Sequence, residues 1–404
     1  MSDTRLLDSR AFRLFWASDT VSMTGSYVTT VAVPLLALNV LHATDTEFGL
    51  LRASTWLPYL LFGLLAGALV DRVRRKPVLV GADLARFALM GLVPLLAAVD
   101  RLTMPVLIAL TVLIGVLSLA YDAAHQSFLP RLVPTERLAD ANARLQQTDS
   151  AAQLAGPALA GALVQVVGAA TAVLVDAVSF LVSGLLLARV RVDEPVERPE
   201  SRNLRQELRE GLSWVYRHRV LAAMALTGHV WFFFNAIVST VVPIYLQQVL
   251  HVAPFAFGVL VAVPGVGGVL GSLLSTRVGR RFGAGRVIVV GHWLTPLGYL
   301  LIPLGGNGIV GLLLVGAAQF VFGFAIGLES PLEMGYRQAV TPDRLQGRMN
   351  ATMRSVNRGS LAFGALLGGV LGDWIGLSAA LWVGIAGLVV QAVATMLSPL
   401  RTIS

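Results

Sequence analysis

The chain has 404 residues, none of them cysteine, and few of them are charged. Without cysteine it can form no disulfide bond, thiolate metal site or cysteine nucleophile. Only 13% of the residues are charged, whereas soluble globular chains have roughly 25%. The sequence also lacks a phosphate-binding Walker loop, zinc-ligand spacing and a nucleophile elbow. We therefore expect no enzymatic activity, no cofactor and no metal site.

Hydrophobic residues make up 55% of the chain, and they gather in runs. Apolar runs of about 20 residues, the length that crosses a bilayer as a helix, recur throughout. We expect an all-α polytopic membrane protein whose first run, from Phe12, is retained as a helix rather than cleaved. The twelve expected spans are 12–41, 48–70, 77–99, 104–125, 147–167, 169–190, 220–248, 254–276, 287–304, 309–330, 351–373 and 377–398.

Positive charge follows the expected topology. The net charge of +8 is scattered between apolar runs, which argues against nucleic-acid binding. Of the 31 Lys and Arg residues, 28 fall in alternate connections, and the exceptions are Arg52, Arg86 and Arg101. The positive-inside rule then predicts that both termini and all long loops are cytoplasmic.

The two halves of the chain resemble each other. GPALAGALVQVVG (156–168) aligns without a gap with GALLGGVLGDWIG (364–376), 208 residues later. An even number of spans per repeat predicts two parallel six-helix bundles related by an axis along the membrane normal. We expect an N-terminal bundle at 1–190, a cytoplasmic linker at 191–219 and a C-terminal bundle at 220–404. The linker is either a simple connection or carries an amphipathic helix at the membrane surface.

Several motifs carry a family resemblance. GALVDRVRRK (67–76) resembles the loop signature of the major facilitator superfamily, although Arg74 stands where a glycine is usual. GPALAG (156–161) resembles the Gly-Pro signature of exporters. The segments SRAFRLFWASDTVSMTG, DLAR, LPRLVPTERLADAN and TPDRLQGRMN resemble the bacterial drug, macrolide and siderophore efflux subgroup.

This resemblance implies a function and a location. We expect a monomeric, proton-coupled exporter of hydrophobic or amphipathic small molecules in the bacterial cytoplasmic membrane. Its partners would be a drug-like, macrolide-like or siderophore-like substrate, protons and membrane lipid. Two alternatives stay open: an importer or lipid transporter on the same fold, and a membrane receptor that transports nothing.

The loop signature implies a gate between transport states. The expected gating residues are Gly67, Asp71, Arg72 and Arg75. A small residue at Gly67 lets a neighbouring helix approach closely. Asp71 could accept hydrogen bonds from a helix N-terminus in one state and lose them in the other. The alternative is that the cations only fix the topology and contact anionic lipid.

Charged residues inside the spans are candidates for proton coupling. Asp83 and Arg86 are three residues apart, so they can form an ion pair that is either structural or part of a proton relay. Asp19 lies about 10 Å into the first span, which by the resemblance lines the central cavity; a capping or interface role is the alternative. Glu329 lies four residues before Glu333, and the two would repel each other if both were ionised. The candidates are Asp19, Glu329, Asp83 and Arg86.

Aromatic and amide side chains suit a broad apolar substrate site. THVWFFFNAIVST, in the seventh span, supplies most of them, and lipid-facing aromatics are the alternative explanation. The substrate-cavity candidates are Tyr27, His229, Trp231, Phe234, Asn235 and Gln319. Glycines at small-xxx-small spacing in the fifth, eighth and eleventh spans predict close helix packing at the interface between the halves.

Overall fold

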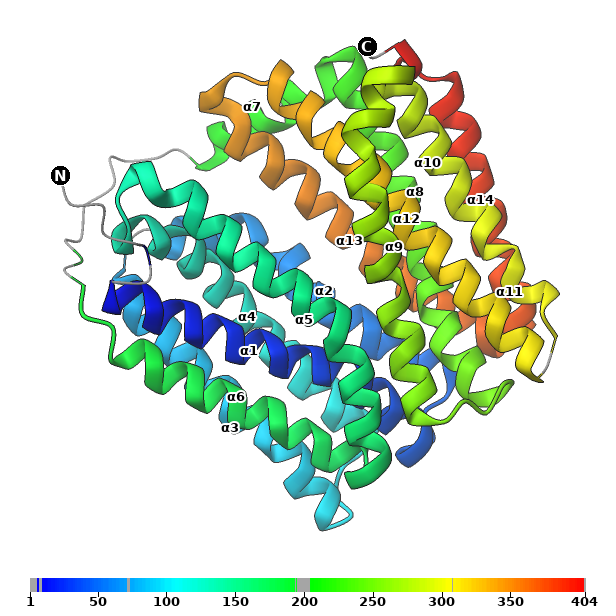
Figure 1. Ribbon diagram of the computed structural model, residues 1–404. Helices are drawn as coiled ribbons and strands as arrows, with labels where there is room; N and C mark the ends of the chain where they lie inside the picture. Colours follow the sequence, from blue (N-terminus) through cyan, green and yellow to red (C-terminus); the bar gives the residue numbers. More distant parts are fainter. Residues whose placement is uncertain are drawn as a thin grey trace. The chain divides into compact units, whose positions relative to one another are not determined.

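The computed structural model describes residues 6, 9–70, 73–192, 194, 204–306 and 308–402, except for the side chains of 64–70, 204–205, 207–208 and 402. Helices dominate this part of the chain, and no strand occurs in it (Figure 1). The helices are α1 (Arg10–Leu35), α2 (Asp45–Val70), α3 (Arg75–Ala98), α4 (Met104–Leu132), α5 (Leu138–Val167), α6 (Ala169–Ala188), α7 (Leu204–Arg217), α8 (Arg219–Gln248), α9 (Pro254–Phe282), α10 (Ala284–Tyr299), α11 (Leu301–Leu304), α12 (Gly308–Val340), α13 (Asp343–Ile375) and α14 (Leu377–Leu397).

Twelve of these helices correspond to the predicted spans. Among the described residues, ten helices are long and apolar enough to cross a membrane. The helices α2 and α13 are not among these ten, but they contain 26 and 33 residues. The helix α12 runs ten residues past its predicted end at 330, so Glu333 lies within a continuous helix.

Local signals define several helix ends. Ser9 accepts a hydrogen bond from the backbone N–H of Phe12 at 3.3 Å, which begins α1. Gly168 ends α5 with φ of 83°, and Gly376 ends α13 with φ of 83°. Glycine adopts this left-handed region without the steric cost that a side chain adds. These two glycines are aligned by the internal repeat, so both copies stop the helix in the same backbone conformation.

The contacts between residues divide the chain into two compact units. The first unit consists of Met1–Leu41 and Leu61–Arg202, and the second of His42–Leu60 and Asn203–Ser404. The division near residue 202 falls inside the linker expected at 191–219. Sequence reasoning did not anticipate that the first part of α2 groups with the second unit while its last part groups with the first.

Each unit repeats the same set of helix contacts. In the first unit, α1 packs against α5 and α6, and α3 packs against α4 and α6. In the second unit, α8 packs against α13 and α14, and α10 packs against α12 and α14. These are equivalent helices in the predicted repeat. The structure therefore confirms the predicted fold class of two six-helix bundles.

The linker contains a helix, α7, that packs against the second unit. Val215 is fully buried on this helix, in a cluster that includes Met224, Met349 and Met353. Gly211 lies against α13 so closely that a Cβ there would be 2.8 Å from the hydroxyl oxygen of Thr352. The linker therefore contains a helix, and the location of this helix at the membrane surface stays a prediction.

Close helix packing at the glycines is confirmed. It joins the expected halves at Gly372 of α13, where a Cβ would lie 2.7 Å from an Asp45 side-chain oxygen of α2, but at the glycines of α9 it lies within one half. A Cβ on Gly267 of α9 would lie 2.3 Å from the carbonyl oxygen of Phe320, and one on Gly271 would lie 2.3 Å from that of Phe324. Both contacts join α9 to α12 inside the second unit. Gly364 of α13 likewise contacts the backbone of Phe233 on α8. The spacing indicates close approach, but it does not identify the neighbouring helix.

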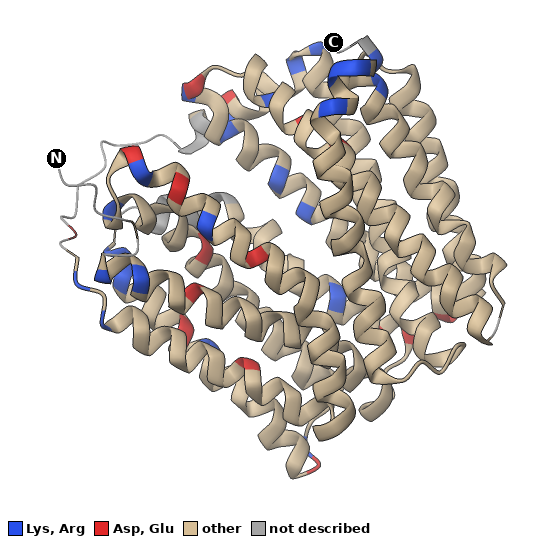
Figure 2. Ribbon diagram, viewed as in Figure 1, with Lys and Arg blue, Asp and Glu red and all other residues tan. Residues whose placement is uncertain are grey.

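Charges concentrate at one end of the helices within each unit (Figure 2). The long middle stretches are almost free of Lys, Arg, Asp and Glu. The few charged residues that lie inside the bundles are therefore candidates for functional residues.

Candidate functional site

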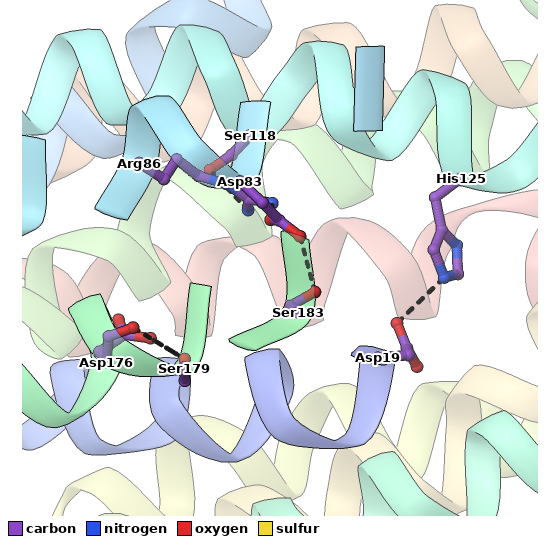
Figure 3. Close-up of polar contacts among 8 residues, drawn as sticks. All are labelled: Asp19, Asp83, Arg86, Ser118, His125, Asp176, Ser179 and Ser183. Atoms are coloured by element: carbon purple, nitrogen blue, oxygen red, sulfur yellow. Dashed lines mark hydrogen bonds and ion pairs between the residues drawn. The ribbon is translucent and has the colours of Figure 1, made fainter. Parts of the chain in front are cut away.

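Asp19, on α1, faces His125, on α4 (Figure 3). The carboxylate oxygen Oδ1 lies 3.0 Å from Nε2 of the imidazole, and the two side chains are 11% and 22% exposed. The His125 ring stacks on Phe15 with centroids 4.7 Å apart and lies beside Tyr121 at 5.7 Å. No Lys or Arg contacts Asp19 within the part of the chain that the structure describes.

Asp83 and Arg86 form the ion pair that their spacing predicts, inside α3. Asp83 also accepts a hydrogen bond from the Ser183 hydroxyl on α6 at 2.6 Å. The Arg86 guanidinium lies between two aromatic rings, 4.2 Å from the centroid of Tyr121 and 4.4 Å from that of Phe180. Both charged groups are buried and neutralise each other. Their contacts with Tyr121, Phe180 and Ser183 connect α3 to α4 and α6.

A third buried carboxylate joins α6 to α1. Asp176 accepts hydrogen bonds from the hydroxyls of Thr29 and Ser179. Gly25 makes this approach possible, because a Cβ there would lie 2.1 Å from the Ser179 hydroxyl oxygen. Hydroxyl donors on both carboxylate oxygens indicate a role in helix packing.

Glu329 and Glu333, on α12, are brought together with His292, on α10. The Nε2 atom of His292 lies 3.8 Å from an Oε1 atom of each glutamate. The side chains of His292 and Glu329 are 5% and 7% exposed, and that of Glu333 is 21% exposed. Gly291 leaves the space for Glu329, since a Cβ there would lie 2.2 Å from its Oε2 atom.

Two of the cavity candidates lie in an aromatic cluster within the second unit. Asn235, on α8, accepts a hydrogen bond from the hydroxyl of Tyr299, on α10, at 2.9 Å. Trp231 lies one turn before Asn235 and stacks on Phe322 of α12 with centroids 6.2 Å apart. Phe322 stacks in turn on Tyr299 at 5.2 Å. Trp231, Asn235 and Tyr299 are all buried, so the cluster forms part of the packed interior of the second unit.

The other cavity candidates lie elsewhere. His229 contacts α7 and α13, and the Phe234 ring lies against Gly387 of α14. Tyr27, on α1, donates a hydrogen bond to Asp149 of α5 at 3.0 Å. Gln319 is half-buried on α12. The side chains between 229 and 235 therefore face different neighbouring helices, because successive residues are spread around the axis of α8.

Most of the expected gating loop lies outside the described residues. This is true of Asp71, Arg72 and the surroundings of Gly67. Arg75 is buried at the start of α3, where its backbone N–H donates to Glu194 at 2.6 Å. The N–H of Lys76 donates to the other oxygen of Glu194 at 3.1 Å. A linker carboxylate thus caps the positive end of α3, which sequence reasoning missed.

Sequence reasoning also missed both histidines that meet the candidate acids. His125 and His292 each lie inside an apolar run, and an ionisable residue there is a functional candidate by default. That signal was sufficient to select them, although it could not identify their partners. Among the described residues, no group of three or more His, Cys, Asp or Glu side chains is arranged to hold a metal ion.

Comparison with known proteins identifies the class of protein. The multidrug efflux pump Tap of Mycobacterium bovis (strain BCG) is 28% identical over 393 residues, covering 91% of this chain and 88% of that protein. Macrolide efflux protein A of Streptococcus pyogenes is 23% identical over 378 residues, covering 91% of this chain and 90% of its own. A crystal structure of a variant of the nucleoside transporter NupG superposes with a TM-score of 0.79 at 11% identity, covering 96% of this chain and 99% of NupG.

The fold, the repeated bundles and these similarities define a multi-pass membrane transporter of the major facilitator type. The chain belongs to the transmembrane secretion effector family of that superfamily, whose pattern matches residues 3–404.

Proposed function

We propose that the protein is a proton-coupled exporter of hydrophobic or amphipathic small molecules, with Asp19 and His125 as its main proton-exchanging pair. The observation that carries this proposal is the absence of a fixed positive charge beside Asp19 among the described residues. Its ion-pair partner is an imidazole 3.0 Å away. Imidazole, unlike guanidinium, also exists in a neutral form, so Asp19 is not paired with a permanently charged group.

We propose Asp19 ahead of Asp83 because the two carboxylates have different partners. Asp83 lies against the guanidinium of Arg86, which stays charged at any physiological pH. Protonating Asp83 would leave that cation buried without its partner, at a high cost. The Asp19 side chain is 11% exposed, whereas that of Asp83 is fully buried. Asp83 and Arg86 therefore serve to hold the bundle that carries the Asp19 site.

A second proton site is proposed at Glu329. Buried Glu329 and half-buried Glu333 lie one turn apart and repel each other when both are ionised, and His292 lies 3.8 Å from each. One shared proton would relieve this repulsion. The two sites are in different units, so each unit would carry one acid and histidine set.

The proposed substrate class rests on the efflux relatives and on the aromatic cluster. Relatives named as macrolide and multidrug efflux proteins are 23% and 28% identical to this chain. The rings of Trp231, Phe322 and Tyr299 and the Asn235 amide pack together in the second unit. In a transport state that exposes them, they would accept flat or bulky apolar groups and one hydrogen bond. Hydrophobic cations, macrolides and siderophores are the compounds to screen.

Further parts of the proposal concern topology and gating. We place both termini on the cytoplasmic side of the bacterial inner membrane, because 28 of 31 Lys and Arg residues lie in alternate connections. The protein would act as a monomer with bundles at 1–190 and 220–404. The loop with Gly67, Asp71, Arg72 and Arg75 would form the gate.

The test uses everted membrane vesicles that contain the full chain. Addition of a transported hydrophobic cation should release protons, which a pH-sensitive dye detects. Asp19→Asn should lower this release at least about tenfold, since it removes the exchanging proton. His125→Gln should weaken the release, because Asp19 loses the imidazole that lies 3.0 Å away.

The matched control is Asp176→Asn, which neutralises another buried acid of the same unit. Its two hydroxyl partners can bond an amide, so export and proton release should persist. If proton release survives both Asp19→Asn and Glu329→Gln, the assignment of the proton sites is wrong. If drug accumulates in intact cells expressing the protein, instead of being expelled, the direction is import.

A further inference from the structure

A pocket of about 550 Å³ lies between α7 and the start of α13, within the second unit. Arg209, Ser213 and Arg217 line it from one face of α7, where their spacing of four residues stacks them along the helix. Arg344 lines it from the first turn of α13. The pocket belongs to none of the buried acid sites described above.

Among the residues that the structure describes, positive charge exceeds negative charge around this pocket. Glu210 is the carboxylate among the lining residues, and it is already engaged, pairing with Arg348 and accepting a hydrogen bond from Gln206 at 2.9 Å. Asp343, nearby on α13, accepts a hydrogen bond from Gln346. Arg209, Arg217 and Arg344 have no carboxylate partner among the described residues, and each is exposed. Three guanidinium groups around one cavity repel one another unless an anion joins them.

The wall of the pocket is rigid and partly apolar. The indole N–H of Trp214 donates to the Thr341 hydroxyl at 3.2 Å, which ties the ring to the turn that precedes α13. His218 is also held, because its Nδ1 atom accepts from the backbone N–H of Leu221 at 3.2 Å. The arginines therefore surround a preformed space whose volume suits a small ligand.

From this arrangement we infer that the pocket between α7 and α13 binds a phosphate ester. Guanidinium groups match the oxygens of phosphate through paired N–H donors, and arginine is the residue of choice for such planar recognition. Two sources share this chemistry: the headgroup of an anionic phospholipid and a soluble phosphate. The inference is independent of the proposed export, because it uses no residue of the proton or substrate sites.

The experiment measures hydrogen exchange across 204–218 and 341–348 in the full-length protein in lipid nanodiscs. One arm compares phosphatidylcholine discs with discs that also contain phosphatidylglycerol. The other adds inorganic phosphate to phosphatidylcholine discs, against sodium chloride of equal ionic strength. Protection by phosphatidylglycerol alone identifies the lipid headgroup, and protection by inorganic phosphate identifies a soluble ligand.

Matched variants decide whether the pocket is responsible. The single change Arg344→Gln should lower the affinity for the ligand that gives protection about tenfold, the usual loss for one charge-assisted hydrogen bond. The triple change Arg209→Gln, Arg217→Gln, Arg344→Gln should abolish the protection. The control removes three arginines from the end of α9 instead: Arg277→Gln, Arg280→Gln, Arg281→Gln.

Two results would overturn the inference: no protection by either probe, or equal protection in the control and in the triple pocket variant. If the triple variant does not fold, the single variant and Arg217→Lys still decide. Lysine keeps the charge but loses the paired donors, so unchanged binding in Arg344→Gln and Arg217→Lys would also reject the site.

Discussion

The hydroxyl oxygen of Tyr216, on α7, lies 2.9 Å from Nε2 of His229, on α8. The other ring nitrogen of His229 lies 2.7 Å from Oδ1 of Asn357, on α13. Because Asn357 presents an oxygen, Nδ1 carries the hydrogen and Nε2 accepts from the tyrosine. Burial raises the pKa of the Tyr216 hydroxyl, which keeps this donor protonated. His229 therefore joins the linker helix to two helices of the second unit.

This contact predicts that Tyr216→Phe loosens α7. The variant leaves Nε2 of His229 without its donor, at a cost of about 1 kcal/mol. Hydrogen exchange across 204–217 should then become about fivefold faster. The control is Tyr336→Phe, which also removes a tyrosine hydroxyl. Tyr336 is half-buried and packs against the apolar cluster that contains Val215 of α7. Equal exchange rates in the wild type and in Tyr216→Phe would contradict the prediction.

The Asp83 and Arg86 pair predicts strong non-additivity. Either Asp83→Asn or Arg86→Gln alone leaves one buried charge without its partner and should cost about 3–5 kcal/mol. The double variant removes both charges and should be more stable than the sum of the single changes implies. Chemical unfolding in mild detergent measures the stability of the wild type, the two single variants and the double variant. Additive losses would mean that the two side chains do not act as a pair.

A carboxylate of α13 caps α2. Asp373 accepts hydrogen bonds from the backbone N–H groups of Asp45 at 3.2 Å and Thr46 at 2.8 Å. Asp373→Ala should therefore destabilise the start of α2 by about 0.5–2 kcal/mol, the usual loss for an N-terminal cap.

Exchange rates across 44–52 provide the measurement for this cap. The conservative variant Asp373→Asn keeps an acceptor oxygen and should restore part of the protection. The prediction fails if Asp373→Ala leaves exchange at the start of α2 unchanged.

The two left-handed glycines give a prediction about backbone geometry. Gly168→Ala and Gly376→Ala should each destabilise the protein by about 1–3 kcal/mol, because both residues have φ of 83° while nothing lies within 4 Å of the added Cβ. The control is Gly81→Ala in α3, a helical position that is equally open. There alanine should be neutral or stabilising, by about 0.5–1 kcal/mol. Thermal unfolding in detergent compares the three, and a loss of the same size at Gly81 would refute the backbone explanation.

The sequence predicts what depends on near neighbours and on hydrophobic length. The spans follow from apolar runs, the Asp83 and Arg86 pair from a spacing of three, and the two bundles from the repeat. The partners of Asp19 and Glu329 could not be predicted, because His125 is 106 residues from Asp19 and His292 is 37 residues from Glu329. The cap that Glu194 provides for α3 depends on the path of a loop, and no local pattern encodes it.

The matched glycine stops at Gly168 and Gly376 have a consequence for the history of the chain. If the chain arose by duplication of a six-helix unit, it would have carried two copies of this glycine helix end, and mutation could have changed each copy separately. Both helix ends still use glycine, and both have the same backbone angles. The two repeats can therefore be compared with each other, and a feature present in both reflects the architecture that the two bundles share. The acids that meet His125 and His292 lie on α1 and α12, which are not equivalent in the repeat, so the two contacts are not copies of each other.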